Sequence, residues 1–291
     1  MKPAAFKYIR VDTVEAVLAV LAEHGGDAKV LAGGQSLVPM LNFRIAAPAV
    51  LVDINPVAEL DYIRAGNASL DIGVRTRQRT LESSPKVGAH CPLLRACAKW
   101  IGHTQIRNRG TVGGSLVHGD PTAELVLAAT LLDAELVIRK RGATRTAAPA
   151  DFFESFMTTD IAEDELLTEV RFPAAPAKSG FGFRELCLRH GDFAVVAAAA
   201  HVTLDHQGRC AEARAAVSGA GPSALRLRGA EAALRGGDGS PENLDDASEK
   251  VPEEVHPIPD LKGSEAYRRE MAKVFVRRAL EDAWTMARER Q

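Results

Sequence analysis

The stretch "TVGGSLVHGD", residues 111–120, places two adjacent glycines between hydroxyl side chains, just ahead of an Asp-Pro step. A second glycine pair occurs earlier in the chain, in "LAGGQSLVPML", residues 31–41. Glycine has no Cβ, so it accepts positive φ and lets a ligand or another backbone come close. Successive backbone amides in such loops form a concavity that binds anions, commonly phosphate. Two such loops in one domain predict that a diphosphate is held from both sides.

The side chains around the glycines favour the same interpretation. Gln35, Ser36, Thr111 and Ser115 add hydrogen-bond donors suited to phosphate oxygens, and neither loop contains a lysine. Neither loop is a Walker A site or a G-x-G-x-x-G fingerprint. Either pair alone is explained by a tight turn, whereas the two together favour a ligand site.

Composition excludes several other classes of protein. The chain has 291 residues, of which 46% are hydrophobic and 25% charged, with a formal net charge of -2. These values are typical of a globular protein with two modest domains or one large domain. The charge argues against a nucleic-acid partner. No apolar run is long enough to span a membrane, and the N-terminus lacks a signal-peptide core. We therefore expect a cytoplasmic protein.

The cysteines and histidines show no metal-ligand spacing. The chain has four cysteines and no C-x-x-C pair, which favours reduced thiols. His201 and His206 are five residues apart and do not share a helical face. We predict no metal site and assign no catalytic side chain in this chain.

The first part of the sequence alternates between helices and strands. A helix begins with Asp12 as its cap, carries apolar residues from Val14 to Leu21, and stops at Gly25. A later helix over residues 121–134 takes Asp120 as its N-cap. The remaining expected elements are a helix over residues 91–102 and strands over residues 28–32, 49–54, 69–76, 135–140 and 165–173.

A linker at residues 174–180 separates a second, smaller part. Three strands are expected at residues 181–189, 194–205 and 211–219, followed by helices at 224–235, 243–250 and 264–288. The fold class is therefore α+β. The expected apolar side of the last helix comprises Tyr267, Met271, Val274, Phe275, Leu280 and Trp284.

Two long motifs resemble a known family. "LAGGQSLVPMLNFRIAAPAVLVDI" and "QIRNRGTVGGSLVHGDPTAE" resemble the two flavin-binding signatures of the FAD subunits of molybdenum-containing hydroxylases, the xanthine dehydrogenase family. These subunits include the medium chains of carbon monoxide dehydrogenases. The resemblance runs the whole length, through "RHGDFAVVAAAA" to "YRREMAKVFVRRAL".

The resemblance implies a two-subdomain FAD-binding domain of the vanillyl-alcohol-oxidase (PCMH) type over residues 1–176, divided near residue 57. It also implies an α+β C-terminal domain, a three-stranded sheet plus helices, over residues 177–291. Both loops would hold the FAD diphosphate, Glu124 would accept from FAD hydroxyls, and Leu167 would pack near the adenine. Arg184 would lie near the flavin and Phe193 would cover one of its faces. The cofactor-binding residues implied are Ala32, Gly33, Gly34, Gln35, Ser36, Leu37, Ile101, Thr111, Gly113, Gly114, Ser115, Glu124, Leu167, Arg184 and Phe193.

The sequence also departs from the carbon monoxide dehydrogenases it resembles. Gln35 stands where they tend to have His, and Ser115 where they tend to have Asn, which disfavours carbon monoxide as substrate. Phe193 replaces the usual tyrosine, a change that would alter the flavin environment but not FAD binding.

The function implied is an FAD-carrying electron-transfer subunit of a heterotrimer, with two heterotrimers forming a dimer. A small subunit would carry [2Fe-2S] clusters, and a large subunit would carry the molybdenum cofactor and the substrate pocket. The alternatives are a stand-alone FAD-dependent oxidoreductase and a non-catalytic assembly subunit. An N-heteroaromatic compound, a purine-type alkaloid and an aldehyde remain open as substrates, as do NAD, a quinone and a carrier protein as acceptors.

The roles of two pairs of side chains remain open as well. Arg107 and Arg109 either neutralise phosphate, contact a partner or are simply solvated, and Trp100 and Trp284 are expected in the core or at an interface.

Overall fold

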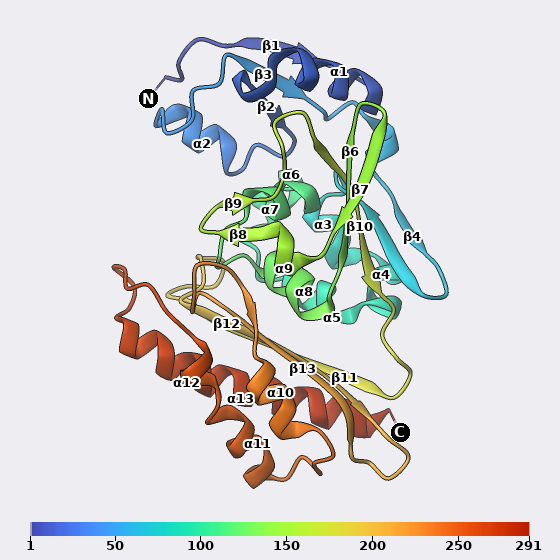
Figure 1. Ribbon diagram of the computed structural model, residues 1–291, viewed down its shortest axis with the longest axis vertical. Helices are drawn as coiled ribbons and strands as arrows, with labels where there is room; N and C mark the ends of the chain where they lie inside the picture. Colours follow the sequence, from blue (N-terminus) through green and yellow to red (C-terminus); the bar gives the residue numbers. More distant parts are fainter. Residues whose placement is uncertain (1, 291) are drawn as a thin grey trace.

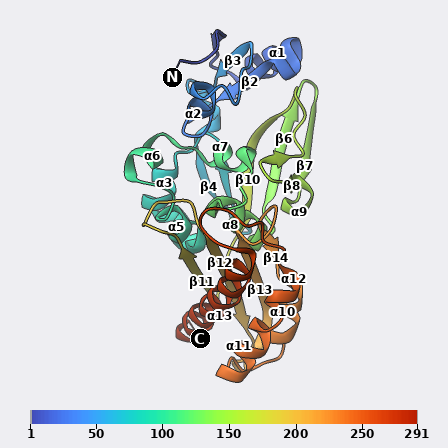
Figure 2. The same ribbon diagram turned by 90° about the vertical axis from the view of Figure 1, so that its left-hand side faces the viewer.

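The computed structural model describes residues 2–290, whose regular elements form three groups stacked along the long axis (Figure 1). The same order is seen when the molecule is turned by 90° (Figure 2). The N-terminal group is a parallel sheet in the order β1-β3-β2. Its elements are β1 (Lys7–Arg10), α1 (Val14–His24), β2 (Ala28–Leu31), α2 (Leu37–Asn42) and β3 (Val50–Asp53), with 3₁₀ turns at Gly25–Asp27 and Ala58–Leu60.

Helix α1 buries the apolar stripe that the sequence predicted, from Val14 to Leu21. Its cap is different, because Thr13 and not Asp12 precedes the first helical residue. The Thr13 hydroxyl accepts from the Ala16 amide at 3.2 Å. The Val14 amide donates to the distant Glu59 carboxylate at 2.8 Å. The spacing of residues near the helix start does not reveal this tertiary contact.

The middle group is built on a five-stranded antiparallel sheet in the order β4-β5-β10-β6-β7. Helices α7 and α8 pack against this sheet, and a small β8-β9 hairpin lies beside α7. The strands are β4 (Ile63–Ala65), β5 (Ser69–Gly73), β6 (Glu135–Lys140), β7 (Ala143–Ala147), β8 (Phe153–Ser155), β9 (Thr158–Thr159) and β10 (Leu166–Pro173). The helices are α3 (Gln78–Ser83), α4 (Pro85–His90), α5 (Pro92–Ala98), α6 (Thr104–Arg109), α7 (Val112–His118), α8 (Glu124–Leu132) and α9 (Pro149–Phe152).

The second glycine pair lies in a helix rather than in the expected loop. Thr111 is the N-cap of α7, and Gly113 and Gly114 form its first turn. The next helix also begins later than expected, at Glu124 after Ala123. Asp120 is therefore not its N-cap. The Asp120 carboxylate instead accepts from the amide and the hydroxyl of Thr122, which closes a turn ahead of the helix.

The C-terminal group is a four-stranded antiparallel sheet in the order β11-β12-β13-β14. Three of its strands were expected, whereas the fourth, β14, has two residues and is too short to leave a pattern. The elements are β11 (Ser179–Leu186), β12 (Val196–Leu204), β13 (Cys210–Ser218), β14 (Leu225–Arg226), α10 (Arg228–Leu234), α11 (Pro241–Ser248), α12 (Val251–Glu254) and α13 (Glu265–Glu289).

Helix α13 covers one face of this sheet at very close range. A Cβ at Gly180 or Gly182 would collide with the backbone of α13, so these two positions of β11 require glycine. The close approach explains why the buried side of α13 is rich in alanine. Of the expected apolar side, Leu280 and Trp284 are buried, Met271, Val274 and Phe275 are partly buried, and Tyr267 is exposed. The other face of the sheet packs against α5 and α8 of the middle group. Between residues 2 and 290 no helix has the length and apolar character needed to cross a bilayer.

Candidate functional site

The two glycine segments meet in space. Gly33 lies against the backbone that leads into α7, and a Cβ at position 33 would be 2.9 Å from the Gly110 Cα and closer still to the Arg109 carbonyl oxygen. Only glycine allows this approach. The convergence that the sequence predicted for the two segments is therefore present.

The first loop offers a run of free backbone donors. Within the described residues, no protein acceptor takes the amides of residues 33–37. Gly34 has φ +72°, a conformation that glycine adopts at no steric cost. The side chain of the next residue, Gln35, donates from Nε2 to the Gly33 carbonyl at 3.1 Å. Consecutive unpaired amides in a turn of this kind bind anions.

The backbone amides of Val112, Gly113 and Gly114 in the second segment already donate hydrogen bonds within the protein. Those of Val112 and Gly113 donate to the Thr76 and Val74 carbonyls, at 3.0 and 2.8 Å. The Gly114 amide is capped by the Thr111 hydroxyl at 3.1 Å. This segment therefore contributes side chains rather than backbone donors, which corrects the expectation of two equivalent loops. The Ser115 hydroxyl accepts from Gln78 Nε2 at 2.8 Å and keeps its own proton for a further acceptor.

Positive charge comes from arginines outside the loops. Arg77 donates to the Arg109 carbonyl oxygen and to Asn55 Oδ1, and Asn55 Nδ2 donates to the Ala32 carbonyl at 2.8 Å. This chain of hydrogen bonds links both glycine segments. Burial, followed by the charges of Arg109 and Arg75, lowers the pKa of Arg77. An anion placed here would relieve that repulsion. Sequence reasoning missed Arg77 and Asn55, because neither lies in a glycine motif.

Arg107 is not a phosphate ligand or a solvated side chain. It is buried, its guanidinium donates to the Ile101 and Gly102 carbonyls at 3.0 and 2.9 Å, and it pairs with Glu82 at 3.0 Å. Arg107 thus fixes the turn that contains Ile101, a residue of the predicted site. Arg109, in contrast, is exposed, and within residues 2–290 its side chain has no ion-pair partner.

Two carboxyl groups face the junction with the C-terminal sheet. Glu124 is the first residue of α8, is half-buried and makes no side-chain hydrogen bond within the described residues. Burial raises the pKa of its carboxyl to about 7. Glu185 of β11 is buried, and neither of its carboxyl oxygens has a hydrogen-bond partner there. Burial, followed by the charge of Glu124, raises the pKa of Glu185 to about 9. Hydroxyl groups of a ligand would satisfy both carboxyls, and Glu185 was not foreseen from the sequence.

Phe193 lies at the end of the loop that joins β11 to β12. Its side chain is 69% exposed and so is free to stack on a ligand. Lys262 donates to the Phe193 carbonyl at 2.8 Å and lies 5.3 Å from the ring centroid. Trp100 packs edge-on against Phe183 and His190, with centroids 6.2 and 4.8 Å away, so it lies at the interface between the middle group and the C-terminal sheet.

Two predicted residues lie apart from these groups. Leu167 is buried in the core of the middle sheet, where it pairs with Ile138. Arg184 follows Gly182 by two residues, so its side chain is on the α13 face of β11, opposite to that of Glu185. There it forms a bidentate pair with Asp282 at 2.6 and 2.8 Å.

Two family models match most of the chain. Residues 4–175 match the family described as the FAD binding domain in molybdopterin dehydrogenase. Residues 181–283 match the CO dehydrogenase flavoprotein C-terminal domain. The two matches meet at the junction between the middle and C-terminal groups.

Similar proteins and solved structures extend over nearly the whole chain. The alpha subunit of the 6-hydroxypseudooxynicotine dehydrogenase complex of Paenarthrobacter nicotinovorans is 41% identical over 99% of this chain and 97% of its own length. The carbon monoxide dehydrogenase of Hydrogenophaga pseudoflava superposes with a TM-score of 0.95 at 37% identity, covering 98% of this chain and 99% of the other. Quinoline 2-oxidoreductase of Pseudomonas putida 86 gives 0.94 at 33% identity, covering 99% of each chain. The chain thus belongs to the FAD-binding flavoprotein subunits of the molybdopterin dehydrogenases, and is an FAD-dependent oxidoreductase subunit.

Proposed function

We propose that this chain carries FAD as the electron-transfer subunit of a heterotrimeric molybdenum-containing hydroxylase. In this proposal it takes electrons from [2Fe-2S] clusters of a small partner subunit and passes them to an external acceptor. The observation that carries the proposal is the first loop, whose free amides of residues 33–37 lie beside Arg77 and Arg109. A donor set of this kind fits the diphosphate of a dinucleotide.

The proposed site uses residues from all three groups of the fold. Residues 32–37 would hold the diphosphate, with Thr111 and Ser115 adding hydroxyl donors from the facing segment. Glu124 would accept from FAD hydroxyls, and Phe193 would cover one face of the ring system. Leu167 and Arg184 are given no direct contact in this proposal, because the first is inside the sheet and the second is paired on the α13 face.

The cofactor supplies the redox chemistry, accepting and releasing electrons, while the protein supplies binding, orientation and electrostatics. In this proposal Gly33 keeps the two segments in contact, Arg77 and Arg109 balance the negative charge, and Glu185 contributes a protonated carboxyl beside Glu124. No side chain of this chain needs to act as a nucleophile.

The partner surface is proposed to include the exposed apolar side chains around Phe193. Leu261 is fully exposed next to Lys262, which contacts Phe193. Leu188 is 69% exposed in the same connection between β11 and β12. Exposed apolar groups beside a redox site are suited to cover by another subunit. The heterotrimer would be completed by a large subunit with the molybdenum cofactor, and two heterotrimers would associate.

We also propose the domain division expected from the sequence, with an FAD-binding domain over residues 1–176, divided near residue 57, and a C-terminal domain over 177–291. The separate sheets of the three groups support it. For the whole enzyme we propose an N-heteroaromatic substrate, since similar proteins are named for caffeine, nicotine and quinoline.

The proposal is tested by purifying the chain from its native source and recording its absorption spectrum, metal content and subunits. FAD bands with iron–sulfur absorbance, molybdenum and two further chains support it. Reduction of the flavin in the isolated chain by a small substrate would favour a stand-alone oxidoreductase instead. A colourless protein would show that the glycine segments do not hold FAD.

A further inference from the structure

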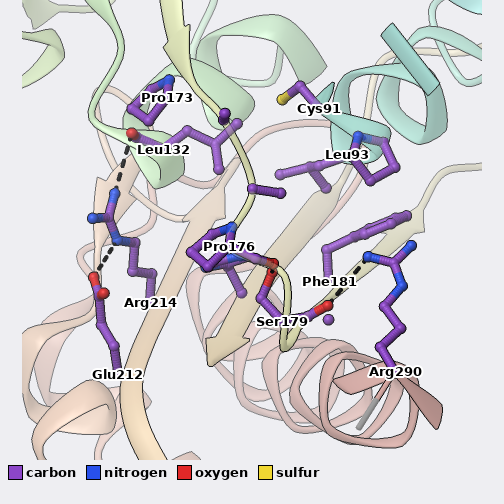
Figure 3. A pocket seen from close by; sticks show the side chains of 15 residues that line it. Cys91, Leu93, Leu132, Pro173, Pro176, Ser179, Phe181, Glu212, Arg214 and Arg290 are labelled. Atoms are coloured by element: carbon purple, nitrogen blue, oxygen red, sulfur yellow. Dashed lines mark hydrogen bonds and ion pairs between the residues drawn. The ribbon is translucent and has the colours of Figure 1, made fainter. Parts of the chain in front are cut away.

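A second polar site lies on the far side of the junction, away from the glycine segments. A cavity of about 110 Å³ lies between the C-terminal sheet, the start of α5, the end of α8 and residues 173–176 at the end of β10 (Figure 3). Its apolar walls include Leu93, Leu132 and Phe181. A water molecule occupies about 30 Å³ in the liquid, so the cavity has room for a small organic molecule.

His201 is the unexplained group in this cavity. It lies on the central strand β12, directly opposite Phe181 of β11 and Arg214 of β13, so all three side chains share the face that lines the cavity. The His201 residue is 8% exposed, and neither ring nitrogen has a hydrogen-bond partner within the described residues. Buried polar atoms of this kind are almost always satisfied by a protein group, a water or a ligand.

The charges around His201 favour an anion. Arg214 is already neutralised, because it pairs with Glu212 at 2.7 Å and with Asp133 at 3.2 Å. Arg290, at the end of α13, donates to the Ser179 carbonyl at 3.2 Å, and no carboxylate among residues 2–290 pairs with it. Among residues 2–290, Arg290 is therefore the arginine lining this cavity that has no carboxylate partner, and its side chain is exposed. A guanidinium is planar and matches a carboxylate with two parallel hydrogen bonds.

We propose that this cavity binds a short-chain carboxylate. Arg290 and His201 would hold the carboxylate group, and Phe181, Leu93 and Leu132 would contact the hydrocarbon part. The apolar walls argue against phosphate, which has no hydrocarbon part to pack against them. Because the site is lined by both the C-terminal sheet and the middle group, a bound ligand would also brace the two against each other. Carboxylate binding in this cavity does not depend on the proposed FAD site.

The proposal predicts a pH dependence with a definite sign. Burial, followed by the charge of Arg214, lowers the pKa of His201 to about 4, with Arg226 and Arg290 acting in the same direction and Glu212 opposing them. A carboxylate beside the ring stabilises its protonated form, so the ligand and a proton bind together. Affinity is therefore expected to rise as the pH falls toward the His201 pKa of about 4 in the free site.

The test is calorimetric titration of the full chain with acetate, butyrate and benzoate, using butyramide as the uncharged match of butyrate. Saturable binding of a carboxylate, with at least tenfold weaker binding of butyramide, is expected. Arg290→Gln and His201→Leu should each weaken carboxylate binding at least tenfold, whereas His206→Gln, on an exposed side chain, should not. Thermal unfolding and flavin content check that each variant is folded. Absence of saturable binding by all three acids, equal binding of butyramide, or ordered waters alone on His201 in a crystal of the soaked protein would overturn the proposal.

Discussion

Gly33 and Arg109 are in contact although 76 positions separate them in the sequence, and the contact is between backbones, so that no side chain fits at position 33. Through it the first glycine loop is held against the segment that starts α7. This approach, together with the hydrogen bonds of Arg77 and Asn55, places the donors proposed to bind FAD relative to each other.

Replacing Gly33 with alanine is expected to push the two segments apart, at a cost of about 1–3 kcal/mol in stability, and to lower FAD retention sharply. Flavin absorbance per mole of purified chain measures the effect. Gly66→Ala is the matched control, because a Cβ there meets only the Ser69 carbonyl oxygen at an ordinary 3.5 Å. Full flavin content in a folded Gly33→Ala variant would show that the approach is not needed for binding.

The two glycines of α7 should behave differently from each other. A Cβ at Gly113 would be 2.5 Å from the Val74 Cβ, inside the packed sheet, whereas a Cβ at Gly114 would meet only the Thr111 hydroxyl at 2.8 Å. Gly113→Ala is therefore expected to destabilise the chain strongly even without FAD, whereas Gly114→Ala, which displaces the Thr111 hydroxyl from the Gly114 amide, is expected to cost only about 1 kcal/mol, the usual effect of losing an N-cap. Thermal unfolding of the flavin-free chain separates the two. Equal losses of stability would contradict this assignment.

Arg77→Gln is expected to weaken FAD binding by about 1.5–3 kcal/mol, the usual effect of losing a hydrogen bond to a charged group. It removes both the positive charge and the link from Asn55 to Arg109. Fluorescence titration of the flavin-free chain, at low and high salt, measures the change. Arg141→Gln, on an exposed side chain, should leave the affinity unchanged. An unaltered dissociation constant for Arg77→Gln would remove Arg77 from the proposed site.

Glu124→Ala is expected to weaken FAD binding by about 1–3 kcal/mol, because FAD hydroxyls would lose their acceptor in a partly buried place. Glu124→Gln should retain part of the affinity, since its amide oxygen still accepts. The same titration distinguishes the two variants. If both bind FAD as the unchanged chain does, Glu124 makes no contact with it.

Glu185 should make the flavin-free chain less stable as the pH rises. Its pKa is raised from 4.5 to about 9, so between these values the folded chain holds a proton that the unfolded chain has released. Stability is then lost as the pH rises, by up to about 1.4 kcal/mol per pH unit. Glu185→Gln cannot ionise and should be the more stable chain at pH 8, with a smaller pH slope. Denaturant unfolding at pH 6 and pH 8 tests this, with the exposed Glu23→Gln as control. Parallel pH profiles for the two variants would contradict it.

The sequence by itself determined the elements with strong local patterns. The apolar spacing from Val14 to Leu21 predicted α1, and the apolar runs predicted β3, β6 and β10. Burial of one helix face or of a whole strand produces a local pattern of apolar residues, which the sequence shows directly. The glycine motifs identified the segments of the proposed cofactor site and the family. These features depend on neighbours in the chain.

The tertiary structure decided what depends on distant residues. Gly113 and Gly114 lie in the first turn of a helix, where the Gly113 amide donates to the distant Val74 carbonyl and the Gly114 amide donates to the Thr111 hydroxyl. Arg77 and Glu185 entered the proposed site only through packing, and Arg184 was turned toward Asp282 because α13 lies against its face of β11. Such contacts join residues far apart in sequence, and local propensity carries no information about them because the free energy of each depends on which partner the fold brings near.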